Sequence, residues 1–512
     1  MFRLRKLEKD SREALYTVGL LPMKDRVAKS VFWIVWSRGG LQVLSFLSTL
    51  VVARLLQPAD YGLMAMAGIW TATIVLIVEM GLGAAIVQFR DLNERELNAC
   101  FWSTMAVAGG GYLGLFIAAP WIAHWFETQA LTDVLRVAGL TLPLGAVRLV
   151  PENLLRKELA LDKISKAEIA SVAISIPITL VMAWAGFGVW ALVASALMMQ
   201  GVRSAITFWF LPWHPGFRIG SARFFELMHF SGAILGTRFC VGLYQQADVL
   251  VLGKLSGEAV VGIFSMAKQL ALLPVEKISV MINEVVTPVM AELQANQTAM
   301  RAAFLRGIRL VACITVPLSL GISLVAEDLV WVTLTEKWLP AVPLLQILCI
   351  YAMLRSGDVL FAPVLRARYR VTFLLRYAIA LVLIMPLAFW AGAFSLGATG
   401  VALAWVCMYP FIMFWMAHTT LHELDLAWNT LWLQVRLPLG ASVVMAGVVL
   451  AIQYLMPGVT LGERGVRLLC ASGGGVIAYC GCIFWRGGLI VDELREMSGW
   501  FFRNRRQAAV GK

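Results

Sequence analysis

Long continuous apolar runs alternate with short polar connections along most of the chain. About 14 runs of roughly 20 residues can be placed, and each is long enough to cross a hydrocarbon core. They are too long and too continuously apolar to be the alternating strands of a membrane barrel. The pattern therefore predicts an all-α polytopic membrane protein with about 14 transmembrane helices. The approximate spans are 31–52, 62–87, 99–122, 134–151, 168–186, 188–211, 226–250, 259–288, 308–326, 341–363, 373–394, 398–417, 432–455 and 466–485.

Composition narrows the class of protein further. Of the 512 residues, 60% are hydrophobic and only 14% are charged, which is more apolar surface than a water-soluble fold can bury. The eight cysteines lie within or at the ends of apolar runs and form no CxxC pair, so we interpret them as packing residues. We expect no catalytic residues, no metal site and no cofactor.

Lysine and arginine predict the orientation in the membrane. They are dense in the segment 1–28 and in alternate connections such as 152–166, but absent from 124–133. By the positive-inside rule both termini are cytoplasmic, because an even number of spans returns the chain to its starting side. The connection 418–430 is the exception, since it is predicted inside yet has no basic residue. The net charge of +12 then reflects topology and attraction to anionic lipid, and we expect no nucleic-acid binding.

The chain contains an internal duplication at an offset of 200 residues. VVARL at 51–55 resembles VLGKL at 251–255, and the same offset pairs Gly62 with Gly262. With small gaps the repeat extends over about six spans, and repeats of this size are typical of transporters. A repeat with an even number of spans keeps its orientation, so the two lobes should be related by an axis along the membrane normal, with the substrate path between them.

These observations predict five regions. They are a basic cytoplasmic tail at 1–28, an N-terminal lobe of spans 1–6 at 29–212, a C-terminal lobe of spans 7–12 at 224–418, the extra spans 13 and 14 at 431–486, and a second basic cytoplasmic tail at 487–512.

Polar side chains inside the predicted spans mark the candidate substrate path. A charge at the membrane centre costs about 2.5–3.5 kcal/mol on insertion scales, so such residues face a protein interior or an aqueous cavity. Cations outnumber anions at the deeper positions, which favours an anionic substrate entering from the cytoplasm. For the substrate-binding cleft we select Arg38, Arg238, Lys268, Arg355, Gln42 and Gln245. For coupling to an ion gradient we select Glu79, Asp248 and Asp358.

Structural roles compete with these assignments. Arg355 and Asp358 are three residues apart on one helix face, so they also fit an ion pair between helices. For Glu79 the structural alternative is a protonated carboxyl that forms a hydrogen bond and takes no part in ion coupling. His418 and His422 have the i, i+4 spacing of a metal-binding pair, but they have no convincing further ligand, and we interpret them as interfacial packing.

Several motifs resemble those of one known family. ARLLQPADYGLMAMA at 53–67 and GLGAAIVQ at 81–88 resemble the first helical hairpin of bacterial polysaccharide transporters, the lipid-linked oligosaccharide flippases. The segments 245–270 and 288–294 and the connection PENLLRKELALDK at 151–163 are similar to later parts of that family. The resemblance covers spans 1–12 and is strongest to the branch with colanic-acid, teichuronic-acid and succinoglycan exporters. That branch belongs to the multidrug and oligosaccharidyl-lipid exporter superfamily.

The resemblance implies a flippase of the bacterial cytoplasmic membrane. It would move an undecaprenyl-pyrophosphate-linked oligosaccharide repeat unit by alternating access, for exopolysaccharide, capsule or O-antigen biosynthesis. Its partners would be this anionic lipid-linked oligosaccharide, membrane lipids, and polymerase and chain-length proteins of the same pathway. An ion-coupled multidrug or peptidoglycan-precursor exporter of the same superfamily is an alternative, although a drug exporter would favour carboxylates in its cleft. A membrane polysaccharide polymerase or ligase is another, although it needs a large outer loop that the sequence lacks.

Overall fold

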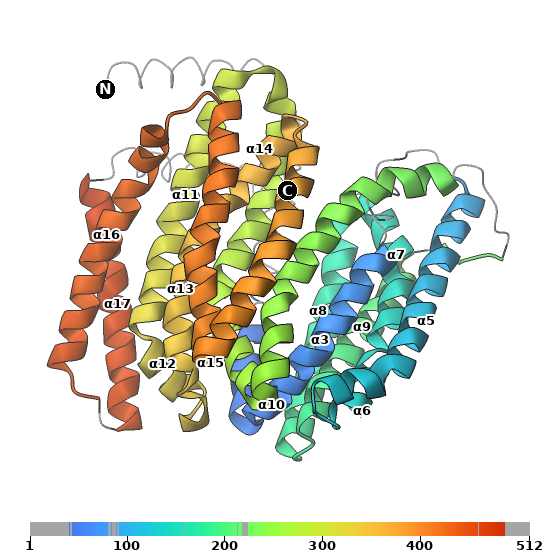
Figure 1. Cartoon of the computed structure of the whole chain (residues 1–512), viewed down its shortest axis with the longest axis horizontal. Coiled ribbons are helices and arrows are strands. Elements are labelled where there is room, and N and C mark those ends of the chain that lie inside the picture. Colours follow the sequence, from blue (N-terminus) through green and yellow to red (C-terminus); the bar gives the residue numbers. More distant parts are fainter. Residues whose placement is uncertain are drawn as a thin grey trace, which may run out of the picture. The chain divides into compact units, whose positions relative to one another are not determined.

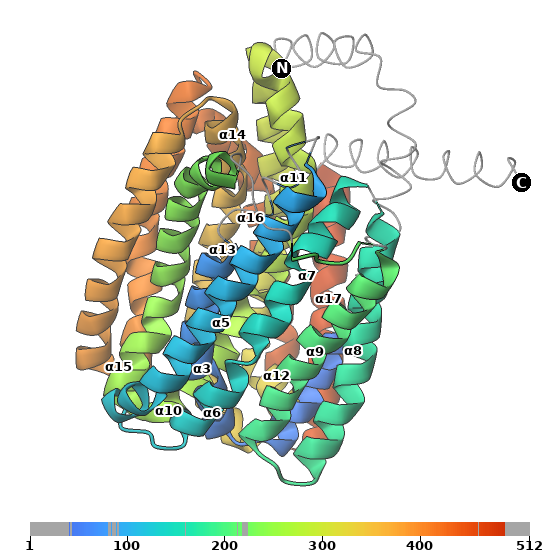
Figure 2. The same ribbon diagram turned by 90° about the vertical axis from the view of Figure 1, so that its right-hand side faces the viewer.

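The computed structural model describes residues 44–79, 92–158, 160–211, 213–217, 224–458 and 460–486, with isolated positions at 40, 83, 86 and 89; at 224–235, 279–285 and 288 it describes the backbone alone. Throughout these residues the regular elements are helices, which Figures 1 and 2 show from two directions. The prediction of an all-α polytopic fold is confirmed.

The helices pack into two compact units. The N-terminal unit comprises the described residues within 30–266 and 375–404, and the C-terminal unit those within 267–374 and 405–486. This grouping assigns parts of the predicted C-terminal lobe to the N-terminal unit. The lobe boundaries proposed from the sequence remain a prediction.

In the N-terminal unit, local sequence signals set the helix ends. Pro58 starts one helix because its fixed φ suits a first helical turn. Asn93 and Glu96 form a reciprocal capping box at the start of another. α7 packs against α5 and α9, and α8 packs along α9 (Figure 2). The helices of this unit are Leu44–Leu55, α3 (Pro58–Glu79), α5 (Glu94–Trp125), α6 (Leu131–Ala138), α7 (Thr141–Lys157), α8 (Leu161–Trp184) and α9 (Val189–Phe210).

In the C-terminal unit, α11 is the central helix. It packs against α13 on one side of its surface and against α16, which in turn packs on α17 (Figure 1). The elements of this unit are η1 (Leu293–Ala295), α11 (Gln297–Leu324), α12 (Ala326–Thr333), η2 (Glu336–Trp338), α13 (Ala341–Ser356), η3 (Gly357–Leu360), α14 (Phe361–Ala367), α16 (Trp428–Leu455) and α17 (Leu461–Arg486).

Two very long elements, α10 (Phe224–Glu292) and α15 (Val371–Glu423), each consist of two helices joined at a glycine. Gly257 and Gly397 have φ values of +79° and +59°, a backbone conformation that L side chains rarely adopt. Eleven candidate spans occur in the described residues, and they become thirteen when these two elements are divided. Helix Leu44–Leu55, which overlaps the predicted first span, brings the number to the expected 14.

Residues related by the duplication contact each other directly. A Cβ atom on Gly62 would lie 1.7 Å from the carbonyl oxygen of Glu258, and one on Gly262 would lie 1.8 Å from that of Pro58. Positions 58 and 258, like 62 and 262, are equivalent at the 200-residue offset. The same contact is therefore made in both directions, as across a two-fold axis. This reciprocity agrees with the predicted parallel repeat, and it explains why both positions are glycine.

The outer faces of the helices are apolar. Large side chains such as Trp184, Leu383, Phe394 and Tyr454 are mostly exposed on the molecule. An exposed apolar surface of this extent suits a lipid environment, because lipid chains rather than water then cover it. The helix lengths and the exposed faces together describe a multi-pass membrane protein.

Candidate functional site

The polar residues selected from the sequence fall into two groups, one in each unit. The N-terminal unit contains Glu79, Arg238, Gln245 and Asp248, and the C-terminal unit contains Lys268, Arg355 and Asp358. Arg38 and Gln42 lie outside the described residues. Each group is considered below by itself.

Glu79 and Arg238 form an ion pair. Arg238 lies on the first half of α10 and Glu79 ends α3, and their Nη1 and Oε2 atoms are 3.7 Å apart. The side chains are 59% and 49% exposed, and 3.7 Å is longer than a charge-assisted hydrogen bond, so the pair is loose. Glu79, which has no neighbouring charge in the sequence, thus has a cationic partner in the fold. An arginine held this loosely keeps most of its donors for other acceptors.

Asp248 is the deepest carboxylate among the selected residues. It has no exposed surface, and its Oδ1 atom accepts a hydrogen bond of 2.8 Å from the backbone N–H of Val249. Gln245 lies one turn earlier on α10 and is partly buried. Asp248 is therefore enclosed by protein within the N-terminal unit, whereas Gln245 keeps part of its surface exposed.

In the C-terminal unit, aromatic rings connect Lys268 to Asp358. The Lys268 ammonium lies 5.3 Å from the centre of the buried Trp405 ring, which packs on Tyr351 at 4.4 Å. Tyr351 packs edge-on against Tyr409, whose hydroxyl donates to Asp358 Oδ2. This aromatic network joins α10, α13 and α15 around ionisable groups.

Arg355 and Asp358 do not share a regular helix as expected from their spacing. α13 ends at Ser356, and Asp358 lies in the 3₁₀ segment η3. Arg355 is close enough to Asp358 for its charge to act on the carboxylate. The two residues thus lie in successive elements and remain electrostatically coupled.

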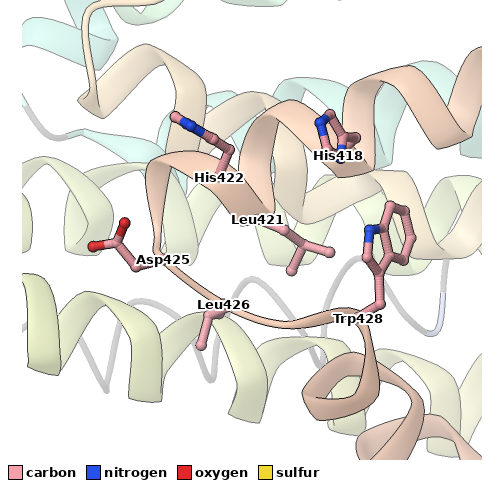
Figure 3. A pocket seen from close by; sticks show the side chains of 6 residues that line it. All are labelled: His418, Leu421, His422, Asp425, Leu426 and Trp428. Atoms are coloured by element: carbon pink, nitrogen blue, oxygen red, sulfur yellow. The ribbon is translucent and has the colours of Figure 1, made fainter.

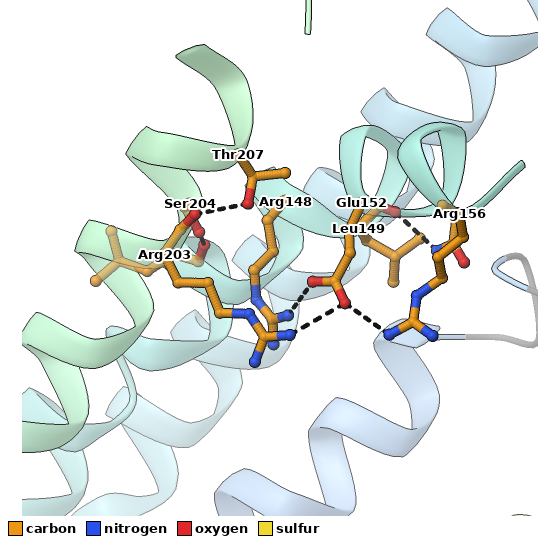
Figure 4. Close-up of polar contacts among 9 residues, drawn as sticks. Arg148, Leu149, Glu152, Arg156, Arg203, Ser204 and Thr207 are labelled. Atoms are coloured by element: carbon orange, nitrogen blue, oxygen red, sulfur yellow. Dashed lines mark hydrogen bonds and ion pairs between the residues drawn. The ribbon is translucent and has the colours of Figure 1, made fainter. Parts of the chain in front are cut away.

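A second polar cluster was missed in the sequence. Glu152 on α7 is bound by three arginines: Arg148 at 2.5 Å, Arg156 at 2.8 Å and Arg203 of α9 at 3.1 Å (Figure 4). We call these four residues the Glu152 cluster. The spacing of positions 148, 152 and 156 places them on one helix face, a signal that was available. The fourth member comes from another helix, which only the fold identifies.

A third cluster fastens the last two spans to the C-terminal unit. Asp328 of α12 is 1% exposed and accepts two hydrogen bonds from Arg467 of α17, at 2.7 and 2.5 Å. Arg464 lies 2.9 Å from Glu327 and 3.9 Å from Asp328. We call these four residues the Asp328 cluster. It holds two positive and two negative charges and connects α17 to α12.

His418 and His422 border a hollow of about 260 Å³ at the end of α15 (Figure 3). His418 is part of a stack with Phe414 and Trp428. Asp425, also at this hollow, is already bound to Arg301 at 2.6 Å. In the described part of the chain, no group of three potential ligands is placed to hold a metal ion. The stacking agrees with the interfacial packing that we inferred for these histidines.

The fold is that of known multi-pass membrane transporters. The solved structure titled lipid II flippase MurJ, inward closed conformation, matches with a TM-score of 0.70 over 90% of this chain and 100% of that chain, at 11% identity. An inward-facing multidrug resistance MATE family transporter of the MOP superfamily matches with a TM-score of 0.59 over 75% and 95% of the two chains, at 14% identity. At these identities the likeness concerns the fold.

The chain belongs to the family described as polysaccharide biosynthesis protein, whose sequence profile matches residues 51–343. The teichuronic acid biosynthesis protein TuaB of Bacillus subtilis (strain 168) is 26% identical over 295 residues, which are 56% of this chain and 61% of TuaB. The succinoglycan biosynthesis transport protein ExoT of Rhizobium meliloti (strain 1021) is 24% identical over 382 residues, 75% of this chain and 77% of ExoT. The family predicted from the sequence motifs is confirmed.

Proposed function

We propose that the protein is a flippase for an anionic oligosaccharide repeat unit linked to undecaprenyl pyrophosphate. It moves this unit from the cytoplasmic to the outer leaflet of the bacterial cytoplasmic membrane, with both of its own termini cytoplasmic. The observation that carries the proposal is membership of the polysaccharide biosynthesis family in a chain whose fold matches a lipid II flippase over 90% of its length. The protein works by binding and moving its cargo rather than by changing covalent bonds.

Alternating access of two lobes would carry the cargo across. Arg38, Arg238, Lys268 and Arg355, with Gln42 and Gln245, would bind the pyrophosphate and acidic sugars through charge-assisted hydrogen bonds. The weak pairing of Arg238 with Glu79 supports this role, because an arriving phosphate can replace a partner 3.7 Å away. The polyprenyl tail would remain in lipid. Polymerase and chain-length proteins of the same pathway would receive the product.

Glu79, Asp248 and Asp358 are the proposed sites of coupling to an ion gradient. Protonation of Glu79 would end its attraction for Arg238 and leave that arginine to the cargo. Asp358 accepts a hydrogen bond from the Tyr409 hydroxyl and interacts with the charge of Arg355. Protonation of Asp358 would therefore change both interactions. The burial of Asp248 suits a site that is occupied by a proton or a metal cation only in one state.

A flipping assay in vesicles tests the proposal. Purified protein is reconstituted with a fluorescent lipid-linked oligosaccharide, and the fraction accessible to a membrane-impermeant quencher is followed in time. Arg238→Gln should lower the rate by about tenfold or more, since one charge-assisted contact is lost. Lys166→Gln is the matched control, because Lys166 is 63% exposed and pairs only loosely with Asp162. No flipping by the folded wild-type protein, with any lipid-linked oligosaccharide of the family's type, would contradict the proposal.

Coupling is tested in the same vesicles with imposed proton or sodium gradients. Glu79→Gln, Asp248→Asn and Asp358→Asn are compared with the wild-type protein. Substitution of the residue that couples transport should abolish the dependence of the flipping rate on one gradient and leave cargo binding intact. If all three variants respond to the gradients as the wild-type protein does, none of them is the coupling site.

A further inference from the structure

The Glu152 cluster contains more positive charge than its carboxylate neutralises. Glu152 is 8% exposed on its side chain and has three guanidinium groups around it. Glu168 of α8 also attracts Arg203. Three positive charges therefore face two negative ones, in the interior of the N-terminal unit.

Its donors are also incompletely used. Each guanidinium has five N–H groups, and each arginine makes one close contact with Glu152. The Nε atoms of Arg148 and Arg203 are buried and have no hydrogen-bond partner among the described residues. A buried donor without a partner costs about 1–3 kcal/mol. The nearby hydroxyls of Ser204 and Thr207 donate to backbone carbonyls instead (Figure 4).

A purely structural ion pair does not account for this arrangement. A link between α7 and α9 needs only Glu152 and Arg203. Arg148 and Arg156 lie on the same helix as Glu152, one turn before and one turn after it, so they add no connection between helices. They add charge and donors, which is the composition of an anion-binding site.

The cluster is also accessible from one direction. The side chain of Arg156 is 46% exposed, whereas those of Arg148 and Arg203 are each 22% exposed. Arg156 lies in the last turn of α7, where the distribution of lysine and arginine predicts the cytoplasmic end of a span. An anion can therefore reach the guanidinium groups past Arg156.

We propose that Arg148, Arg156 and Arg203 form a docking site for a phosphate group, and that Glu152 is an internal counter-ion that holds them together when no phosphate is bound. An arriving phosphate with more than one negative charge competes with the single charge of Glu152 and takes over its guanidinium groups. The phosphate belongs either to the lipid-linked cargo or to an anionic lipid headgroup. The cargo role rests on the proposed function.

Binding of inorganic pyrophosphate to the purified full-length protein tests this site. Affinity is measured by calorimetric titration in nanodiscs of phosphatidylcholine, which has no net charge. Arg203→Gln and Arg148→Gln should each weaken binding by about tenfold. Glu152→Gln should strengthen it several-fold, because the competing carboxylate is gone. Lys166→Gln, with the same charge change on an exposed side chain, should bind as the wild-type protein does.

The opposite signs at Glu152 and the arginines distinguish a docking site from a structural cluster. Unchanged affinity in the arginine variants, or weaker binding by Glu152→Gln, overturns the proposal. If Arg203→Gln does not fold, Arg203→Lys retains the charge without the planar fork and should still lose several-fold in affinity. An unchanged affinity in a folded Arg203→Lys counts against the site.

A comparison of neutral with anionic nanodiscs identifies the source of the phosphate. Adding phosphatidylglycerol to the nanodiscs should weaken pyrophosphate binding if a lipid headgroup is the natural occupant, and leave it unchanged if the cargo is. The binding assay does not depend on transport. A failed flipping assay with intact, arginine-dependent binding therefore refutes the proposed function and not the docking site, and the reverse result refutes only the site.

Discussion

The Glu152 and Asp328 clusters both contain a buried carboxylate bound by arginines, but their charges differ. Arg467 binds both oxygens of Asp328, and Arg464 lies between Asp328 and Glu327, so the cluster holds two charges of each sign and is neutral. Glu152 faces three arginines, two of which come from its own helix. The first arrangement balances its charges and connects two helices, whereas the second leaves positive charge in surplus. A buried guanidinium Nε without a partner among the described residues occurs in both, so the difference lies in the charge.

The difference indicates how charge inside a membrane protein divides between stability and binding. A neutral cluster is stable because each buried charge has an opposite charge beside it. A cluster with surplus charge is stable only to the extent that water or a further anion completes it. Four predictions test this distinction, beginning with the largest expected effect.

Arg467→Gln should be the most destabilising of these changes. It leaves Asp328, which is 1% exposed, with only Arg464 at 3.9 Å. Removing one partner of a buried pair typically costs about 3–5 kcal/mol. Denaturant unfolding of the purified protein in detergent measures the loss, with Lys166→Gln as the control. A loss below about 1 kcal/mol would mean that the Asp328 cluster is not a stabilising link.

Apolar replacement of each pair should separate the two clusters. Asp328→Leu with Arg467→Met removes a matched pair, so stability should return to within about 1–2 kcal/mol of the wild-type value. Glu152→Leu with Arg203→Met leaves Arg148 and Arg156 without their carboxylate and should remain destabilised by more than about 2 kcal/mol. The same unfolding measurement compares them. Equal recovery of stability in the two double variants would contradict the proposed difference between the clusters.

Phosphate should rescue only one of the clusters. Glu152→Gln leaves three guanidinium groups without their counter-ion and should unfold more easily in phosphate-free buffer. Inorganic pyrophosphate at about 100 times its dissociation constant should return about 2.7 kcal/mol, by binding to the folded state alone. Arg467→Gln should gain no more than the wild-type protein does. Thermal unfolding with and without pyrophosphate is the measurement. Arg467→Gln and the wild-type protein keep the site and its competing carboxylate, so a gain for Glu152→Gln no larger than theirs would speak against the proposal.

An exposed ion pair should have the smallest effect on stability. Glu127, 79% exposed, binds Lys254 at 2.8 Å, and this hydrogen bond and the positive charge lower the pKa of the Glu127 carboxyl. Because the pKa is lower in the folded state, the stabilisation is present above the ordinary glutamate value and is lost as the pH falls through the lowered one. Glu127→Gln should therefore be slightly less stable than the wild-type protein at pH 7. The difference should vanish in acid and shrink in high salt, as thermal unfolding from about pH 3 to 7 would reveal.

The class, the spans and the repeat were accessible from the amino-acid sequence. Long apolar runs must be helices in lipid, since every backbone polar group there needs a partner within its own segment. The paired positions 62 and 262 indicated the duplication. Their function in packing was not accessible, because only the fold brings each glycine against a carbonyl of the other repeat.

The partners of the residues selected as site candidates were only partly predictable from the sequence. Glu79 was selected as a lone carboxylate, yet it lies 3.7 Å from Arg238, which is 159 positions later in the chain. Asp358 and Arg355 were expected to share one helix face, but Asp358 lies in a 3₁₀ segment, where Tyr409 also binds it. Arg203 lies in an apolar run and was not selected from the sequence. Only the fold shows that α9 places it beside Glu152.

The sequence by itself determined which segments enter the membrane and which of them are repeated, because hydrophobic transfer and backbone hydrogen bonding depend on local composition. The tertiary structure decided which charges meet, and therefore which are neutralised and which remain in surplus. That outcome depends on the rotation and spacing of helices that lie far apart in the chain. A shift of about one residue turns a helix by roughly 100° and moves a side chain to another face.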